Sequence, residues 1–302
     1  MNENKMGVMP VNKLLLTMAA PMVLSMLIGA LYNVVDSLFV SHYGENALSA
    51  VSLAFPIQNI IIATGTGIGV GINALLSRYL GEKKQKAVNQ TAMHGIILGA
   101  GFYVLILLFG IFCVRSFYVV QTNEAEIVSM GIDYLTVICV FGFGQLFQLI
   151  FEKILQSTGR TSYTIVMQIV GAVINIILDP IFIFGYFGLP AMGTKGAAIA
   201  TVTGQIVAML LGLYFNLTKN KDVQFHFKYI NIESYYFKGI CTVGIPTIIM
   251  QSMSSVMCFG INKLLLNFST TSTAVFGAYP CLPCYHQSRY LDILWNLNVF
   301  SL

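Results

Sequence analysis

The stretch "NIILDPIFIFG", residues 175–185, places Asn175, Asp179 and Pro180 inside a run of isoleucine, leucine and phenylalanine. In a water-soluble protein, this pattern could be a strand that ends in a turn. Inside a membrane, a carboxylate is energetically costly and a proline removes a backbone hydrogen bond. Whether this stretch lies in water or in a membrane therefore decides both its fold and the interpretation of its polar residues.

The composition indicates a membrane protein. The chain is 56% hydrophobic and 9% charged, with a mean hydropathy of +0.77, whereas soluble domains are about 25% charged. Apolar runs of roughly 20 residues, long enough to cross about 30 Å of hydrocarbon as helix, recur along the chain. We therefore predict an all-α integral membrane protein, with spans near 14–39, 48–76, 89–112, 127–155, 162–184, 196–216 and 240–266.

The basic residues alternate between connections. The first, third and fifth connections hold only Arg115 and Lys195. The N-terminus and the second, fourth and sixth connections hold Lys5, Lys13, Arg78, Lys83, Lys84, Lys86, Lys153, Arg160, Lys219, Lys221, Lys228 and Lys238. Because cytoplasmic loops are enriched in Lys and Arg, we predict a multi-pass protein of the plasma membrane with a cytoplasmic N-terminus.

Cysteine and catalytic patterns do not indicate an enzyme. The six cysteines form no disulfide framework, and "CLPC" at 281–284 lacks the second ligand pair that a zinc site needs. The sequence has no H-E-x-x-H, G-x-S-x-G or P-loop pattern. We expect no catalytic residue, no transition-metal site and no cofactor.

The chain begins to repeat itself after residue 239. "AAPMVLSMLIGALYNVV" (19–35) and "GIPTIIMQSMSSVMCFG" (244–260) both place a proline near the start of a long span, as in a two-lobe transporter. We expect a six-helix lobe (1–217), a cytoplasmic linker (218–239) and the start of a second lobe (240–279). The last segment, 280–302, is too polar to span, and we interpret it as a premature end rather than a natural C-terminal tail.

Two acids lie deepest in the predicted hydrocarbon. Counted at 1.5 Å per residue, Asp36 and Asp179 fall at a similar depth in the outer half of the membrane, together with Thr201. Asn175 lies one helical turn from Asp179. Further polar residues follow the same faces or add uncharged polarity to a cavity wall: Tyr32, Asn33, Gln58, Gln145, Gln148, Gln168 and Gln205. Intramembrane acids mark functional sites by default, although Asp179 and Pro180 could instead cap a helix at the headgroups.

Pro180 adds an oxygen ligand to this group. It cannot donate a hydrogen bond to the carbonyl of Ile176, so it frees that oxygen and favours a bend. Carboxylates, an amide, a hydroxyl and a carbonyl suit a proton or Na⁺ rather than zinc or copper. The opening stretch is therefore interpreted as a transmembrane helix that carries part of a cation-coupling site.

The glycine-rich stretch "ATGTGIGVGINA" (63–74) does not fit a phosphate-binding loop. It lacks the G-x-G-x-x-G spacing and lies within an apolar span. Ala63, Gly67 and Gly71 instead form a small-xxx-small face that favours close helix packing.

These features resemble the multidrug and toxic compound extrusion (MATE) family, in its bacterial DinF- and MepA-like branch. The resemblance covers residues 10 to about 279 and rests on "PMVLSMLIGALYNVVDSLFV" (21–40), "NIILDPIFIFG" and "GTKGAAIAT" (193–201). It implies two six-helix lobes that export organic cations in exchange for H⁺ or Na⁺. By position, Asp36, Asn175, Asp179 and Thr201 look like the amino-lobe cation site, and Pro21 looks like a bend that responds to it.

The resemblance also shows which part of a MATE transporter this chain holds. This chain departs from the family by holding one complete lobe, a seventh helix and an incomplete eighth. We expect a cation-coupled antiporter for small organic cations or drugs, embedded in a lipid bilayer, without nucleic acid or an obligate protein partner, and inactive if truncated. The alternatives are a non-transporting membrane fragment that associates with other helices and a lipid-intermediate flippase of related fold.

Overall fold

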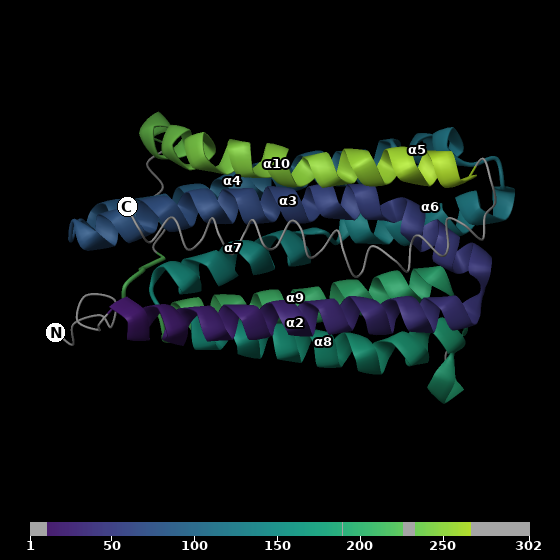
Figure 1. The fold of residues 1–302 in the computed structure, drawn as a ribbon, viewed down its shortest axis with the longest axis horizontal. Coiled ribbons are helices and arrows are strands. Elements are labelled where there is room, and N and C mark those ends of the chain that lie inside the picture. Colours follow the sequence, from purple (N-terminus) through teal and green to yellow (C-terminus); the bar gives the residue numbers. More distant parts are fainter. Residues whose placement is uncertain (1–10, 189, 226–232, 267–302) are drawn as a thin grey trace.

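The computed structural model describes residues 11–188, 190–225 and 233–266. Within these ranges, the regular elements are helices, connected by short turns (Figure 1). The α-helices are α2 (Val11–Tyr43), α3 (Glu45–Gly81), α4 (Gln85–Phe112), α5 (Val114–Gln121), α6 (Ala125–Val140), α7 (Phe143–Ser157), α8 (Thr161–Phe184), α9 (Thr194–Thr218) and α10 (Ser234–Leu266), and the short 3₁₀-helix η1 is Tyr186–Gly188.

The described helices match the seven predicted spans. Six of them are long and apolar enough to cross a membrane by themselves, and α6 with α7 makes a seventh candidate. The all-α membrane fold is therefore confirmed, because runs of about 20 apolar residues have few alternatives to a spanning helix.

The fourth predicted span, 127–155, is not one straight helix. It is broken between α6 and α7, whose axes differ by 44°. Glycines at 142 and 144 weaken the helix here, and the side chain of Ile206 in α9 occupies the space that a Cβ on Gly144 would need. The hydroxyl of Tyr103 in α4 donates to the carbonyl of Val140 at 2.6 Å, so the break is supported from a neighbouring helix.

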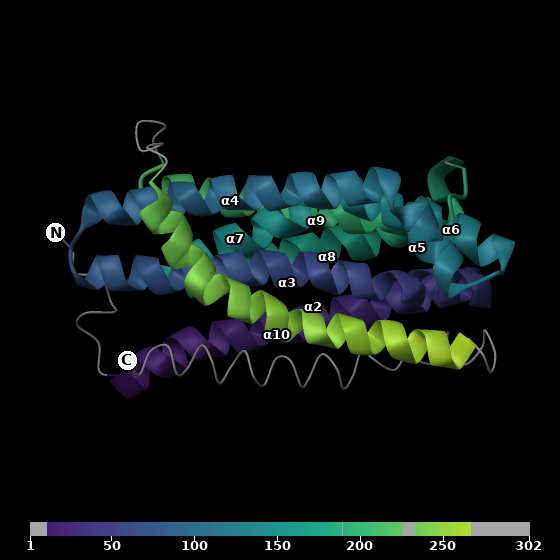
Figure 2. The same cartoon turned by 90° about the horizontal axis from the view of Figure 1, so that it is seen from above.

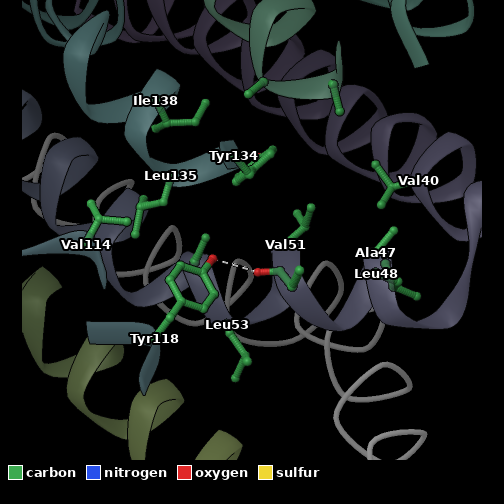
Figure 3. Packing of buried hydrophobic residues seen from close by; sticks show 14 of the residues in the cluster. Val40, Ala47, Leu48, Val51, Leu53, Val114, Tyr118, Tyr134, Leu135 and Ile138 are labelled. Carbon is green, nitrogen blue, oxygen red and sulfur yellow. Dashed lines mark hydrogen bonds between the residues drawn. The ribbon is translucent and has the colours of Figure 1, made fainter. Parts of the chain in front are cut away.

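A short helix, α5, was not predicted as an element of its own. It carries Tyr118, whose fully buried hydroxyl donates a hydrogen bond to the carbonyl of Ala50 in α3 at 2.8 Å (Figure 3). Apolar residues of α3, α5 and α6 surround this ring and form one core cluster. Packing against these longer helices therefore fixes a segment that is too short to be stable alone.

The helices run along one long axis, so the connections gather at two ends (Figures 1 and 2). The inner end holds residues 82–84, 158–160 and 219–225, and the outer end holds residues 44, 113–124, 185–188 and 190–193. The two ends are called inner and outer because the N-terminus is predicted to be cytoplasmic, and this orientation stays a prediction. Most of the basic residues near the connections in the described ranges lie at the inner end. This distribution agrees with the alternation of basic residues along the sequence.

Packing between helices positions the candidate site. Helix α8 packs against both α2 and α9, whereas α3 packs against α7 and α10. The small-residue face of α3 is used as predicted: Gly67 lies against Gly244, and Gly71 lies against Ile240, both in α10. Figure 2 shows α10 crossing α3 at an angle.

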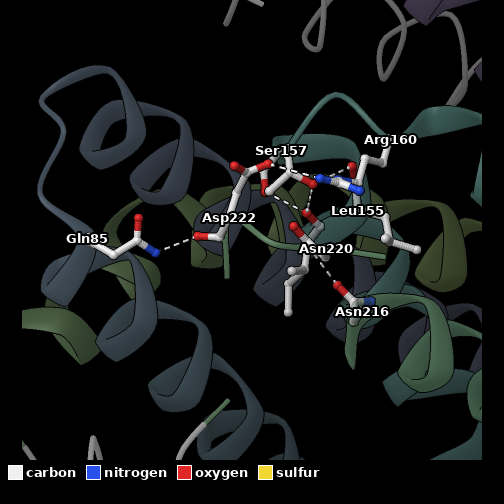
Figure 4. Close-up of polar contacts among 9 residues, drawn as sticks. Gln85, Leu155, Ser157, Arg160, Asn216, Asn220 and Asp222 are labelled. Atoms are coloured by element: carbon white, nitrogen blue, oxygen red, sulfur yellow. Dashed lines mark hydrogen bonds and ion pairs between the residues drawn. The ribbon is translucent and has the colours of Figure 1, made fainter. Parts of the chain in front are cut away.

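A polar network fastens the predicted linker to the inner end. Asp222 pairs with Arg160 at 3.5 Å, and its backbone carbonyl accepts a hydrogen bond from Gln85 at 2.6 Å (Figure 4). Beyond residues 226–232, the hydroxyl of Tyr236 donates to Gln90 in α4 at 2.7 Å. Both ends of the linker are therefore held by the first turns of α4.

Several predictions lie outside the described residues. These are the incomplete eighth helix within 267–279, the non-spanning tail 280–302 and the "CLPC" motif at 281–284. The boundaries of the lobe, linker and second-lobe segment stay predictions as well.

Candidate cation and substrate site

Two neighbouring helices bring three of the predicted cation ligands together. Asn175 and Asp179 lie one turn apart on the same face of α8, and Thr201 faces them from α9. Helices α8 and α9 approach closely: a Cβ added to Gly204 would lie 2.6 Å from the carbonyl oxygen of Gly171. This approach puts short polar side chains within reach of one another.

Asn175 is the centre of this group. Its Nδ2 donates to Oδ1 of Asp179 at 3.3 Å and to Oγ1 of Thr201 at 3.3 Å. Both amide hydrogens are therefore used, and the carbonyl oxygen of the amide is left for another partner. The three side chains are buried, with Asp179 at 0% exposure.

Three oxygen atoms at this site are buried without a hydrogen-bond partner among the described residues. They are Oδ1 of Asp36, Oδ1 of Asn175 and Oδ2 of Asp179. A buried polar atom without a partner is costly, and in native proteins such atoms often mark a place where a ligand binds. Oxygen atoms of this kind can hold a proton or a hard cation.

A cavity of about 150 Å³ opens beside these oxygens, and Asp36, Asn175 and Thr201 line it. The seven residues predicted to line a cavity are all in its wall: Tyr32, Asn33, Gln58, Gln145, Gln148, Gln168 and Gln205. The structure thus places these residues together, while their roles in binding stay predictions. Asp179 does not line the cavity itself and reaches it through Asn175.

The cavity wall has one sign of charge. Among the described residues that line it, Asp36 is an acid and the rest are uncharged side chains. A cation would therefore be attracted into the cavity, whereas an anionic compound would meet a carboxylate without a basic partner.

The connection of two predicted cavity residues, Gln148 and Gln168, to Glu152 was missed. Gln148 donates to Gln168 at 3.4 Å, Gln168 donates to Glu152 at 3.4 Å, and Gln156 donates to the other oxygen of Glu152 at 2.9 Å. This chain of amides leads from the cavity wall to a buried acid nearer the inner end. The signal was in the sequence, because residues 145, 148, 152 and 156 form one polar stripe at helical spacing.

Tyr134 was also missed. It is 1% exposed, lines the cavity from α6, and its hydroxyl accepts a hydrogen bond from Gln58 of α3 at 2.8 Å. A tyrosine in an apolar helix gives no sequence signal that separates a cavity residue from a core residue. Tertiary structure alone places this hydroxyl.

The two prolines predicted as helix bends lie within continuous helices. Pro21 is inside α2 and Pro180 is inside α8. Both helices continue without a break past these prolines. A bend at either proline in response to a bound cation therefore stays a prediction.

Comparison with known proteins agrees with this architecture. The family model MatE matches residues 21–181. The multidrug export protein MepA of Staphylococcus saprophyticus is 26% identical over 264 residues, which are 86% of this chain and 57% of that protein. The FAD transporter of Shewanella oneidensis is 26% identical over 271 residues, which are 89% of this chain and 60% of that protein.

Solved structures give the same result. The chain superposes on the MATE multidrug transporter DinF-BH, solved in complex with the dye rhodamine 6G, with a TM-score of 0.86 and 30% identity, over 93% of this chain and 63% of that one. An inward-facing MATE family transporter matches with a TM-score of 0.78 and 28% identity, over 86% of this chain and 60% of that one. The chain thus spans about 60% of the length of these relatives.

The relatives named here are transporters rather than enzymes, in agreement with the absence of catalytic patterns from the sequence. The matched residues include the acid of α2 and the Asn175–Asp179 pair of α8, which build the oxygen cluster described above. This chain is a multi-pass membrane protein that belongs to the MATE (MatE) family of transporters.

Proposed function

We propose that this chain carries the amino-terminal lobe of a bacterial exporter that moves organic cations or drugs across the plasma membrane in exchange for H⁺ or Na⁺. The observation that carries the proposal is the cluster of three unpartnered oxygens from Asp36, Asn175 and Asp179 beside the cavity. The multidrug export relatives support the direction of transport and the class of substrate.

The oxygen cluster suits a small, hard cation. Two carboxylates that share a poorly solvated site repel each other, and a bound proton or Na⁺ relieves that repulsion. Asn175 fixes the Asp179 carboxylate while its own oxygen stays available. The free carbonyl of Ile176, four residues before Pro180, could supply a further ligand.

The cavity favours cationic over anionic substrates. The FAD transporter relative handles a compound that bears phosphates, but the described wall of this cavity offers them no Lys or Arg. Amides, tyrosines and apolar side chains form the rest of the wall and can adapt to flat organic cations. The dye bound to DinF-BH is a member of that class.

Exchange follows from competition for the same carboxylates. A bound cation removes part of the negative charge of Asp36 and Asp179, weakens their attraction for a positively charged substrate, and favours release of that substrate. A bend of α2 at Pro21 would then narrow the cavity. A bound ion can shift the conformational equilibrium only through its different affinities for the two states.

Dye export by the chain tests this proposal. In inverted membrane vesicles that contain the wild-type chain, energised uptake of rhodamine 6G should exceed that of vesicles without it. Asp36→Asn and Asp179→Asn should each reduce uptake to the level of empty vesicles. Separate proton and Na⁺ gradients identify the coupling ion.

Asp133→Asn is the matched control, because Asp133 is an exposed acid of α6 outside the cavity wall. It should transport as the wild type does, at an equal amount of protein in the membrane. Uptake by both Asp36→Asn and Asp179→Asn at the wild-type rate would contradict the proposed coupling site. Absence of uptake by the wild-type chain would contradict transport by this chain.

A further inference from the structure

Helix α3 contains a proline whose missing hydrogen bond is replaced from another helix. Pro56 has no N–H, so the carbonyl of Ser52, four residues earlier, loses its usual helical donor. Nδ2 of Asn262 in α10 donates to that carbonyl at 3.3 Å. A side chain from the predicted second lobe therefore completes a helix of the first lobe, toward the outer end of the molecule.

The same two helices meet in a different way toward the inner end. A Cβ added to Gly67 would lie 2.8 Å from the carbonyl oxygen of Gly244, and a Cβ added to Gly244 would lie 2.8 Å from that of Gly67. One turn further along α3, Gly71 lies against the backbone of Ile240. The two backbones approach each other directly here, and the nearest neighbours of a Cβ on Gly67 among the described residues are the Gly244 backbone and the apolar Ile248 side chain.

These two contacts differ in how easily they exchange with water. Asn262 is 1% exposed, and its Oδ1 is buried without a hydrogen-bond partner among the described residues. Opening of the outer end would give water to both Oδ1 and the Ser52 carbonyl, so the polar contact loses only the modest net free energy of one neutral hydrogen bond. Separation of the glycine crossing would instead abandon close backbone packing.

We propose that Asn262 is a gating residue, which holds the outer end of α10 against α3 and releases it while the glycine crossing acts as the pivot. The proposal rests on the proposed transport function, because the carrier must open its outer side in each cycle. While the outer ends of α3 and α10 are in contact, Asn262 supplies the donor that Pro56 lacks. In the open state, water donates to the Ser52 carbonyl in place of Asn262.

Two native cysteines of α10 report on the two ends of this contact. Cys258 lies one turn before Asn262 and is 7% exposed, whereas Cys241 is adjacent to Ile240 at the glycine crossing and is partly exposed. Two versions of the full chain, each with one of these cysteines and the others changed to serine, can be reconstituted in liposomes. The rate of reaction with a membrane-impermeant maleimide measures the opening at each place.

Asn262→Ala should raise the labelling rate of Cys258 by about five-fold, the change in open population expected for one lost neutral hydrogen bond. The labelling rate of Cys241 should not change. Asn262→Leu, which keeps a similar volume but removes the donor, should act as Asn262→Ala does. Pro56→Ala should suppress the effect of Asn262→Ala, because the new alanine restores a backbone donor to the Ser52 carbonyl.

Labelling of Cys258 at the wild-type rate in Asn262→Ala would overturn the proposal. An equal rise at Cys258 and Cys241 would also overturn it, because general loosening of the fold would then explain the result. An unchanged effect in the Pro56→Ala background would contradict the role of the Ser52 carbonyl. If labelling behaves as expected but uptake of rhodamine 6G is absent, transport by this chain is contradicted and the gate is not.

Discussion

Asn175 links an acid to a hydroxyl from a second helix, and its position explains why an amide is needed there. The amide donates two hydrogen bonds, to Asp179 and Thr201, and keeps one acceptor for a third partner. A carboxylate at the same position would repel Asp179, and an apolar residue would leave both oxygens without a donor. An amide at position 175 therefore matches the hydrogen-bonding groups of Asp179 and Thr201.

Thr201→Val tests this arrangement. The change removes the acceptor for one hydrogen of Asn175 and leaves a buried donor unpaired, which should lower the free energy of unfolding by about 1–3 kcal/mol. Thr201→Ser keeps the hydroxyl and should lose less. Unfolding of both variants in mixed micelles gives the comparison. A loss in Thr201→Ser as large as that in Thr201→Val would contradict the prediction, because the methyl group would then contribute as much as the hydrogen bond.

At the scale of helices, the close approaches depend on glycine. Gly71 has no room for a side chain because the backbone of Ile240 occupies that space, whereas no atom of the described residues lies within 4 Å of a Cβ placed on Gly101. Both residues are in apolar helices, and the small-xxx-small spacing indicates that Gly71 is in a packing face but does not identify the helix that covers it. The difference is created by α10, which covers one glycine and leaves the other open.

Gly71→Ala and Gly101→Ala should therefore have opposite effects. Gly71→Ala forces α10 away from α3 and should lower the free energy of unfolding by about 1–3 kcal/mol, as in overpacked cores. Gly101→Ala should raise it by about 0.5–1 kcal/mol, because alanine favours the helix. Thermal unfolding in detergent measures both, and a destabilised Gly101→Ala would mean that α4 needs a bare backbone at that position.

The spans and the placement of Asn175 and Asp179 on one helix face could be predicted because each depends on local rules. Apolar length identifies the helices, and a helical spacing of four puts Asn175 and Asp179 on one face. The break at residues 141–142, helix α5 and the Tyr134 hydroxyl depend on contacts between distant segments: Tyr103 with Val140, Tyr118 with Ala50, and Gln58 with Tyr134. Those contacts have no signature within one helix.

At the scale of the whole molecule, charge is distributed unequally between the two ends. Among the described residues, the connections at the inner end hold Lys83, Lys84, Arg160, Lys219 and Lys221, whereas Arg115 and Lys195 lie at the outer end, in the first turns of α5 and α9. The oxygen cluster and the cavity lie among the helices between these ends. Orientation in the membrane therefore decides from which side a cation reaches Asp36.

Labelling of single cysteines tests the orientation. Lys84→Cys should be protected from an impermeant maleimide in intact cells and become labelled after permeabilisation, because the basic end faces the cytoplasm. Lys195→Cys should be labelled in intact cells. Both positions are exposed. The opposite result would place the N-terminus outside.

The central claim is that a coupling cation and an organic cation compete for Asp36 and Asp179, and release of the coupling cation on dye binding tests it most directly. Addition of rhodamine 6G to the purified wild-type chain in weakly buffered detergent solution should release protons, or Na⁺ if the chain is loaded with it. Asp133→Asn should release as much as the wild type, whereas Asp36→Asn and Asp179→Asn should release much less or none. Release by both Asp36→Asn and Asp179→Asn equal to that of the wild type would contradict the account.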